Sequence, residues 1–217
     1  MLKYYCANIG LLEDEAVFEK WFEKMNMQRK EKILRCKKDA DKKRSLMAGI
    51  LLKYALEKEG LCYETLEFSN TSDGKPVLVS DPEIHFSISH SNEYVGCLIG
   101  DSEIGLDIEY KYKSLFAEGK EYRLEHMAKK SLAPTEWERF SECTKQEKER
   151  LYLEYWTKKE SYSKAIGKGL RMDFSQIDTE TNPKEYWSVW TTDDYCVSIY
   201  KKDGCFEELL IEKLKAL

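Results

Sequence analysis

The chain has 217 residues, of which 42% are hydrophobic, enough for the core of one large domain or two small ones and too many for a disordered chain. Its 35 Lys and Arg and 40 Asp and Glu give a net charge of −5, which disfavours broad, nonspecific binding of nucleic acid. Any binding site for an anion must therefore be local.

The cysteines and the apolar segments bear on the cellular compartment. Seven cysteines are scattered along the chain and none is in a C-x-x-C pair, so the sequence indicates neither a disulfide framework nor a zinc site. The N-terminus lacks the features of a signal peptide, and no segment approaches the ~20 apolar residues of a membrane span. We expect a cytoplasmic protein without a membrane segment.

The first part of the chain predicts a strand and two helices. A short strand covers residues 2–9, and an aromatic stripe at helical spacing predicts a helix over 14–25. The segment 29–44 is strongly basic, which alone would indicate a solvated helix face. A second helix over 44–59 puts Arg44 in its first turn, with Gly60 as C-cap.

The rest of the chain mixes strands and helices. Residues 82–110 contain three β-rich runs that predict antiparallel strands, and 111–155 is charged and mainly helical. Thr135 and Glu138 have capping-box spacing, and Gly167 should end the helix that follows. Two further runs, WSVWTT and YCVSIYKK, predict strands, and FEELLIEKL is either a strand or a terminal helix. The class is α+β.

Two carboxylates in one strand are a candidate metal site. Strand alternation in the run 104–109 sends Asp107 and Glu109 to the same face. Such a pair of oxygen ligands suits Mg²⁺, which takes its remaining ligands from water and substrate phosphates. The alternative is an ordinary solvent-facing strand edge.

Three further groups of residues are candidates for a functional site, and each also has an ordinary structural explanation. Glu160 and Lys164 lie on the same side of a predicted helix. The structural alternative is that they form a surface salt bridge and have no other role. His90 ends a strand among hydroxyl side chains that would suit a phosphate monoester, although such a histidine is more often structural. Asp73-Gly74-Lys75-Pro76 has the composition of a turn.

In chain order, these elements form a recognisable series. GKP, ISHS, GLDIE and WTKKESYSKAIGKGL together closely resemble the 4′-phosphopantetheinyl transferases, specifically the Sfp-type branch that activates nonribosomal peptide synthetases. The resemblance implies transfer of the phosphopantetheine arm of coenzyme A to a serine of an acyl or peptidyl carrier protein, with release of adenosine 3′,5′-bisphosphate. It also implies a monomer with two similar α+β halves related by a pseudo-twofold axis: 1–103 grips the nucleotide, and 104–217 binds metal and faces the carrier.

The family's functional residues can be matched to this sequence motif by motif. The resemblance implies that Asp107, Glu109 and Glu160 hold Mg²⁺, that Glu160 is the first candidate for the base, and that Lys164 meets the charge on the leaving group. It implies coenzyme A contacts from Lys32, Arg44, Lys75, Pro76, Ser89 and His90, with a further contact from Arg29 or Lys30.

Two other functions use the same residues. A Mg²⁺-dependent nuclease or phosphohydrolase could employ the D-x-E pair with Glu160 and Lys164, although the acidic net charge disfavours it. A noncatalytic carrier-binding module is the other alternative, and the intact carboxylates argue against it.

Overall fold

A computed structural model describes residues 2–111, 121–192, 194–202 and 204–217. The chain forms two compact units, Met1–Ser102 with Glu207–Leu217 and Glu103–Phe206, here called unit 1 and unit 2. Each unit packs one long helix against a sheet made mainly of antiparallel strands, which confirms the α+β class. No helix among the described residues is long and apolar enough to cross a membrane.

Unit 1 is built on a four-stranded sheet in the order β4-β5-β1-β9. These strands are His85–Ser91, Tyr94–Gly100, Leu2–Asn8 and Leu209–Lys213. Strand β1 is antiparallel to β5 and parallel to β9. A separate hairpin joins β2 (Phe68–Asn70) to β3 (Pro76–Leu78), and Gly74 turns it with a φ of +90°.

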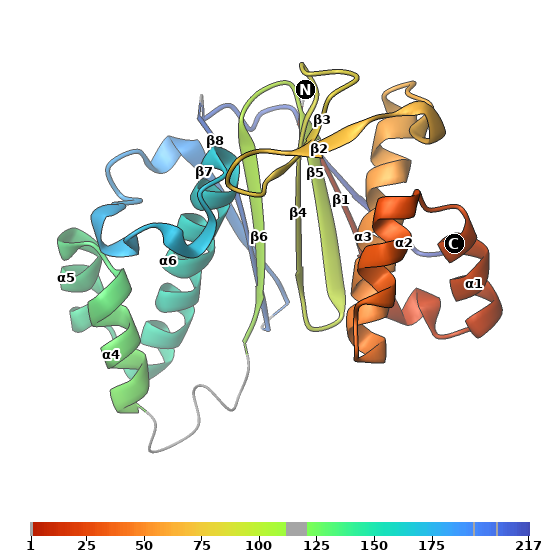
Figure 1. Ribbon diagram of the computed structural model, residues 1–217. Coiled ribbons are helices and arrows are strands. Elements are labelled where there is room, and N and C mark those ends of the chain that lie inside the picture. Colours follow the sequence, from red (N-terminus) through yellow and green to blue (C-terminus); the bar gives the residue numbers. More distant parts are fainter. Residues whose placement is uncertain (1, 112–120, 193, 203) are drawn as a thin grey trace. The chain divides into compact units, whose positions relative to one another are not determined.

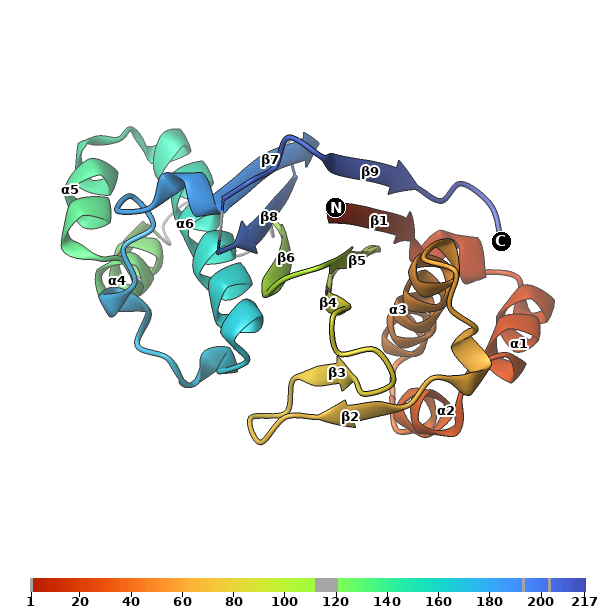
Figure 2. The same cartoon turned by 90° about the horizontal axis from the view of Figure 1, so that it is seen from above.

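Three helices lie on one side of the sheet of unit 1 (Figure 2). They are α1 (Glu15–Glu23), α2 (Met27–Leu34) and α3 (Asp39–Lys58). Helix α3 packs on β5 and β1, and α1 and α2 pack on α3. The core is built where fully buried α3 residues such as Met47 and Leu51 meet strand residues such as Val95. Short 3₁₀ helices, Ile9–Leu12 and Tyr63–Thr65, complete the unit.

Unit 2 has a three-stranded antiparallel sheet in the order β6-β8-β7, formed by Ile104–Tyr110, Tyr195–Lys201 and Tyr186–Thr192. Figure 1 shows α4 (Glu121–Ser131), α5 (Pro134–Glu142) and α6 (Lys145–Ile166) gathered on one side of this sheet. Helix α6 packs directly on β6 and β8 and ends at Gly167, whose φ is +77°. Three 3₁₀ turns follow: Gly169–Arg171 (η3), Phe174–Gln176 (η4) and Pro183–Glu185 (η5).

One long-range pairing differs from the sequence prediction. The sequence places residues 207–217 in the second half, yet β9 pairs with β1 and so belongs to unit 1. Strand β6, which the sequence places at the start of the second half, pairs with β8 of the same half. Alternation identifies a strand and its faces, but it does not specify which distant strand supplies the hydrogen-bonding partner.

Two helix starts also differ from the prediction. Helix α5 begins at Pro134, and the Glu136 carboxylate accepts from the Ala133 N–H at 2.9 Å, so Thr135 and Glu138 form no capping box. Helix α3 begins at Asp39, which moves Arg44 from the first turn to the second. The expected glycine stops after both long helices are confirmed, because Gly60 and Gly167 have positive φ.

Gly105 makes the contact between β6 and α6 possible, and its replacement is a direct test. A Cβ at this position would lie 1.8 Å from the Ser161 carbonyl oxygen. We expect Gly105→Ala to cost about 3 kcal/mol or more, because the backbone of α6 has to move. Urea unfolding followed by tryptophan fluorescence measures this, since four of the five tryptophans lie in unit 2.

Gly169→Ala is the matched control, because Gly169 also lies in unit 2 and has a φ of +57°, but a Cβ added there would meet nothing within 4 Å. It should cost only about 1 kcal/mol, from backbone conformation alone. Equal losses in the two variants would contradict the close-packing explanation.

Candidate active site

The candidate site in unit 2 lies along the contact between β6 and α6. The absent side chain of Gly105 faces the backbone of α6 at Ser161 and Ala165. Because side chains alternate along a strand, Asp107 and Glu109 point to the same side as Gly105, toward α6. The shared face predicted for the two carboxylates is thus the face that the helix covers, not a solvent-exposed edge.

Asp107 forms an ion pair with Lys164 across this contact. The Lys164 ammonium donates to Asp107 Oδ1 at 2.6 Å, and the Asp107 side chain is only 5% exposed. The ion pair of Lys164 is therefore with Asp107 of β6 and is not a surface salt bridge within α6. Its charge is held between the helix and the strand, where low solvent access strengthens the attraction.

Glu160 lies close to the same pair and is 9% exposed. Burial, together with the negative charge of Asp107, raises the pKa of Glu160 to about 7, and Lys164 partly opposes this rise. Two acids and one base therefore share a poorly solvated region, and a further cation would be favoured electrostatically beside the two carboxylates.

Glu109 is placed differently from Asp107 and Glu160. It is half-buried, and its charge helps raise the pKa of Tyr152, behind burial as the main cause. Tyr152 precedes Glu160 by eight residues on α6, so Glu109 lies nearer the start of the helix than Asp107 does. Among the described residues, no three His, Cys, Asp or Glu side chains are grouped closely enough to hold a metal ion.

The donor set nevertheless fits Mg²⁺. Asp107 and Glu160 offer hard carboxylate oxygens, and Mg²⁺ is usually held by one or two protein carboxylates with water and substrate phosphates completing its shell. Asp107 already attracts a cation in the form of the Lys164 ammonium.

A pocket in unit 1 contains several of the residues predicted to contact coenzyme A. It has a volume of about 230 Å³, and its lining includes Arg29, Lys32 and Pro76 beside the rings of Tyr63 and Phe68. Burial lowers the pKa of Lys32, and the neighbouring charge of Arg29 lowers it further. Two close cations next to aromatic rings form a surface suited to a flat, anionic ligand.

The two basic residues left open by the sequence, Arg29 and Lys30, lie differently with respect to the pocket. Arg29 lines the pocket, whereas Lys30 forms an ion pair at 2.8 Å with Glu23 at the end of α1. Lys75 lies in the β2–β3 turn beside the pocket residues Gly74 and Pro76, and its backbone N–H donates to Thr71 Oγ1.

Arg44 and His90 lie together at the β4–β5 turn. Arg44 donates to the Asn92 carbonyl oxygen at 2.7 Å and pairs with Asp41, and the charge of His90 also acts on the Asp41 carboxyl. Ser89 is buried while His90 is exposed, as strand alternation requires for neighbours. The predicted residues of unit 1 therefore fall into a pocket group and a turn group.

Sequence reasoning missed three kinds of residue. The aromatic lining of the pocket, including Tyr63 and Phe68, gave no signal beyond ordinary core positions. Asp41 could have been found from its i,i+3 spacing to Arg44. A fully buried pair, Lys159 and Glu136, could not, because charge patterns do not reveal burial.

The raised pKa of Glu160 predicts a pH-dependent stability. Between its ordinary pKa of 4.5 and about 7, the folded protein retains the Glu160 proton that the unfolded chain loses. The free energy of unfolding therefore falls as pH rises through this window. Relative to Glu160→Gln, the wild type should lose on the order of 2 to 3 kcal/mol between pH 5 and pH 8.

Urea titrations with EDTA and without nucleotide measure this difference. The comparison with Glu160→Gln cancels the titration of all other groups that the substitution leaves unchanged. A difference between the two proteins that is constant from pH 5 to pH 8 would show that Glu160 ionises normally.

Comparison with known proteins identifies the family. Residues 14–102 match a family model described as 4′-phosphopantetheinyl transferase, N-terminal, and residues 103–205 match the 4′-phosphopantetheinyl transferase superfamily. Together the two matches span both units, and both describe transferases, so they give no support to the nuclease alternative.

Individual relatives agree. A 4′-phosphopantetheinyl transferase of Bacillus subtilis is 29% identical over 186 residues, which cover 84% of this chain and 75% of the relative. The 4′-phosphopantetheinyl transferase gsp of Aneurinibacillus migulanus is 30% identical over 177 residues, which cover 78% of this chain and 67% of the relative. The human L-aminoadipate-semialdehyde dehydrogenase-phosphopantetheinyl transferase is 30% identical over 149 residues, which cover 64% of this chain and 48% of the relative. The chain thus belongs to the 4′-phosphopantetheinyl transferase superfamily and is a transferase.

Proposed function

We propose that this transferase uses the α6–β6 contact of unit 2 to move phosphopantetheine from coenzyme A to a carrier serine. The observation that carries the proposal is the group formed by the buried Asp107 and Glu160 and the half-buried Lys164, with the Lys164–Asp107 ion pair at 2.6 Å. Such a group binds a divalent cation and a substrate diphosphate better than it binds either alone, since the charges of cation and diphosphate compensate one another.

Mg²⁺ is the proposed cofactor, held by Asp107 and Glu160 with Glu109 from the same strand face. When bound, it would neutralise the diphosphate and make the β-phosphorus easier to attack. Glu160 is the proposed acceptor of the serine proton, directly or through a water molecule. Lys164, one helical turn after Glu160, is proposed to stabilise the negative charge that develops on the departing bisphosphate.

The cationic groups of unit 1 are the proposed nucleotide site. Lys32 and Pro76 line the pocket with Arg29, which supports contacts to the adenosine part, and Lys75 lies in the adjoining turn. Arg44, Ser89 and His90 come from α3 and β4, and we assign the recognition of the 3′-phosphate to them. Arginine and protonated histidine both form strong hydrogen bonds to phosphate oxygens.

Further assignments follow from the Sfp-type motifs and from the cysteines. We propose that the acceptors include peptidyl carriers of nonribosomal peptide synthesis, and that the enzyme acts as a monomer. All seven cysteines are free, which supports a reducing cytoplasm as its location.

Mass spectrometry of carrier proteins tests the proposed reaction. Apo acyl carrier and apo peptidyl carrier are incubated separately with the enzyme, coenzyme A and Mg²⁺. We expect one carrier or both to gain the mass of one phosphopantetheine group, to lose this gain with EDTA, and to recover it with added Mg²⁺. A carrier with its acceptor serine changed to alanine is the control. Transfer that persists in EDTA would contradict the metal assignment.

Lys164→Met tests the role of the half-buried Lys164 ammonium. If Lys164 stabilises charge in the transition state, kcat should fall by roughly 10²-fold or more, with a much smaller change in coenzyme A affinity. Lys164→Arg keeps the charge but alters its placement, so part of the rate should return. Lys168→Met, an exposed lysine just beyond α6, is the matched control. A folded Lys164→Met enzyme with normal kcat would leave Lys164 a structural ion-pair partner.

Dephospho-coenzyme A tests the assignment of the 3′-phosphate. Calorimetry should show that the wild type loses about tenfold or more in affinity when this phosphate is absent. Arg44→Ala and His90→Ala should lose much less, because the contact is already gone. Lys30→Ala, which removes the ion pair with Glu23 and the contact of the ammonium with the Phe22 ring, should respond like the wild type. Equal losses in all four proteins would remove Arg44 and His90 from the phosphate site.

A further inference from the structure

Unit 2 contains a fully buried lysine next to Glu160. The Lys159 side chain has no exposed surface, and its ammonium lies 2.5 Å from Glu136 Oε2. It also donates to the carbonyl oxygens of Ser131 at 2.7 Å and Phe174 at 2.8 Å. Each of the three N–H groups of the ammonium thus has an acceptor, and the acceptors come from three segments of the chain.

Glu136 is satisfied as completely as Lys159. Its Oε1 accepts from both the backbone N–H and the hydroxyl of Thr179, at 3.0 and 2.9 Å. Its Oε2 accepts from the backbone N–H of Ala133 at 2.9 Å in addition to Lys159. The Lys159–Glu136 pair therefore connects α6 with the end of α4, the start of α5 and the segment 174–179.

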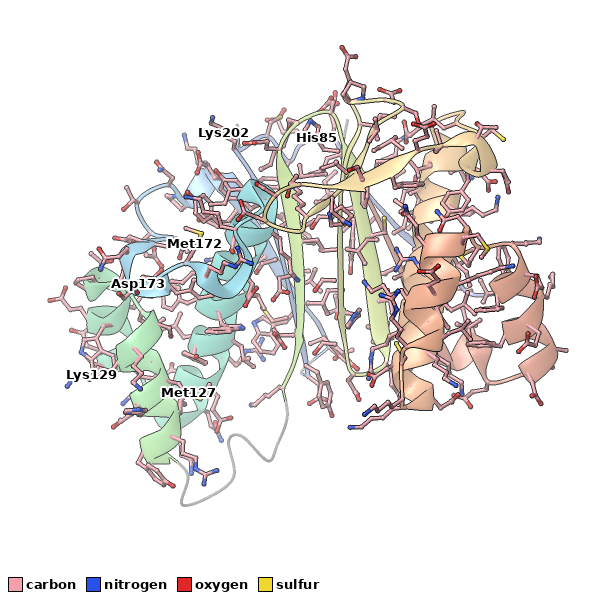
Figure 3. All side chains as sticks on the ribbon, viewed as in Figure 1. His85, Met127, Lys129, Met172, Asp173 and Lys202 are labelled. Atoms are coloured by element: carbon pink, nitrogen blue, oxygen red, sulfur yellow. The ribbon has the colours of Figure 1, made fainter. Side chains whose placement is uncertain are left out.

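The pair holds the segment 172–179 through its contacts with Phe174 and Thr179, and this segment comes shortly after the end of α6. Figure 3 labels Met172 and Asp173 at its start. Residues of this segment, among them Met172, Gln176 and Ile177, form part of the wall of a pocket of about 650 Å³ in unit 2. The pair thus fixes one wall of this pocket as well as the helix.

Stability alone does not explain such a pair. Removing two charges from water is costly, and apolar side chains of similar volume often stabilise a core equally well or better. What the ion pair adds is defined geometry, because each hydrogen bond works only in one arrangement. Neighbouring helical residues point about 100° apart, so fixing Lys159 on one side of α6 also fixes the direction in which Glu160 points.

We propose that Lys159 and Glu136 are positioning residues for the transfer reaction. They hold α6 in the rotation that directs Glu160 and Lys164 toward Asp107, and they hold the segment 172–179 against the helix. The two sides of α6 are thereby fixed independently, one by the buried ion pair and the other by the contact with β6 at Gly105. This inference rests on the proposed roles of Glu160 and Lys164.

The test needs a variant that folds without the pair. Lys159→Met alone leaves the Glu136 carboxylate buried without its cation and should strongly lower the melting temperature. The double variant Lys159→Met/Glu136→Gln contains no uncompensated buried charge, and its amide can still accept from Thr179. Lys158→Met is the matched control, because the neighbouring Lys158 pairs with Glu154 on the more exposed side of α6.

Two readouts separate positioning from stability, both taken well below the melting temperature of every variant. In the double variant, we expect kcat to fall between about 10-fold and 100-fold with the KM for coenzyme A nearly unchanged. We also expect faster tryptic cleavage after Arg171, at the start of the released segment. Lys158→Met should match the wild type in both measurements.

The outcomes are distinct. A folded double variant with wild-type kcat and wild-type cleavage would show that the pair serves stability alone and would overturn the proposal. An inactive wild type would instead contradict the proposed function, and the cleavage rates would still report whether the pair holds the segment. Normal cleavage with reduced kcat would confine the positioning role to α6.

Discussion

The close approach of α6 to β6 is the constraint on which the candidate active site depends. It requires a residue without a side chain at position 105, because a Cβ there would collide with the helix backbone. Once the two elements are in contact, alternation along β6 places Asp107 under the helix, and helical spacing brings Glu160 and Lys164 to it. The charges of the site are therefore buried as a consequence of packing.

Burial of this group has an energetic cost that binding can offset. Burial raises the pKa of Glu160, the charge of Asp107 raises it further, and Lys164 compensates only in part. A divalent cation with a diphosphate would supply the missing balance. In unit 1 the imbalance has the opposite sign, since burial, and then the neighbouring charge of Arg29, lower the pKa of Lys32. Each unit thus has a local charge imbalance that a ligand of opposite charge would offset.

Local features of this structure could be predicted from the sequence, and features that depend on long-range contact could not. The strand with Asp107 and Glu109 on one face follows from alternation, and the end of α6 follows from Gly167. The pairing of β9 with β1 joins opposite ends of the chain and leaves no local signal. For the same reason, Lys159 and Lys158 look alike in sequence, although one is fully buried and the other pairs with Glu154 near the surface.

The central claim is that Asp107 and Glu160 together bind a divalent cation with coenzyme A, and electron paramagnetic resonance of Mn²⁺ tests it most directly. In the wild type, coenzyme A should increase the fraction of Mn²⁺ bound, with one ion per chain. Asp107→Asn and Glu160→Gln should each weaken this binding about tenfold or more, while Glu154→Gln on the outer side of α6 should not. Mn²⁺ binding that is the same in all four proteins would contradict the account.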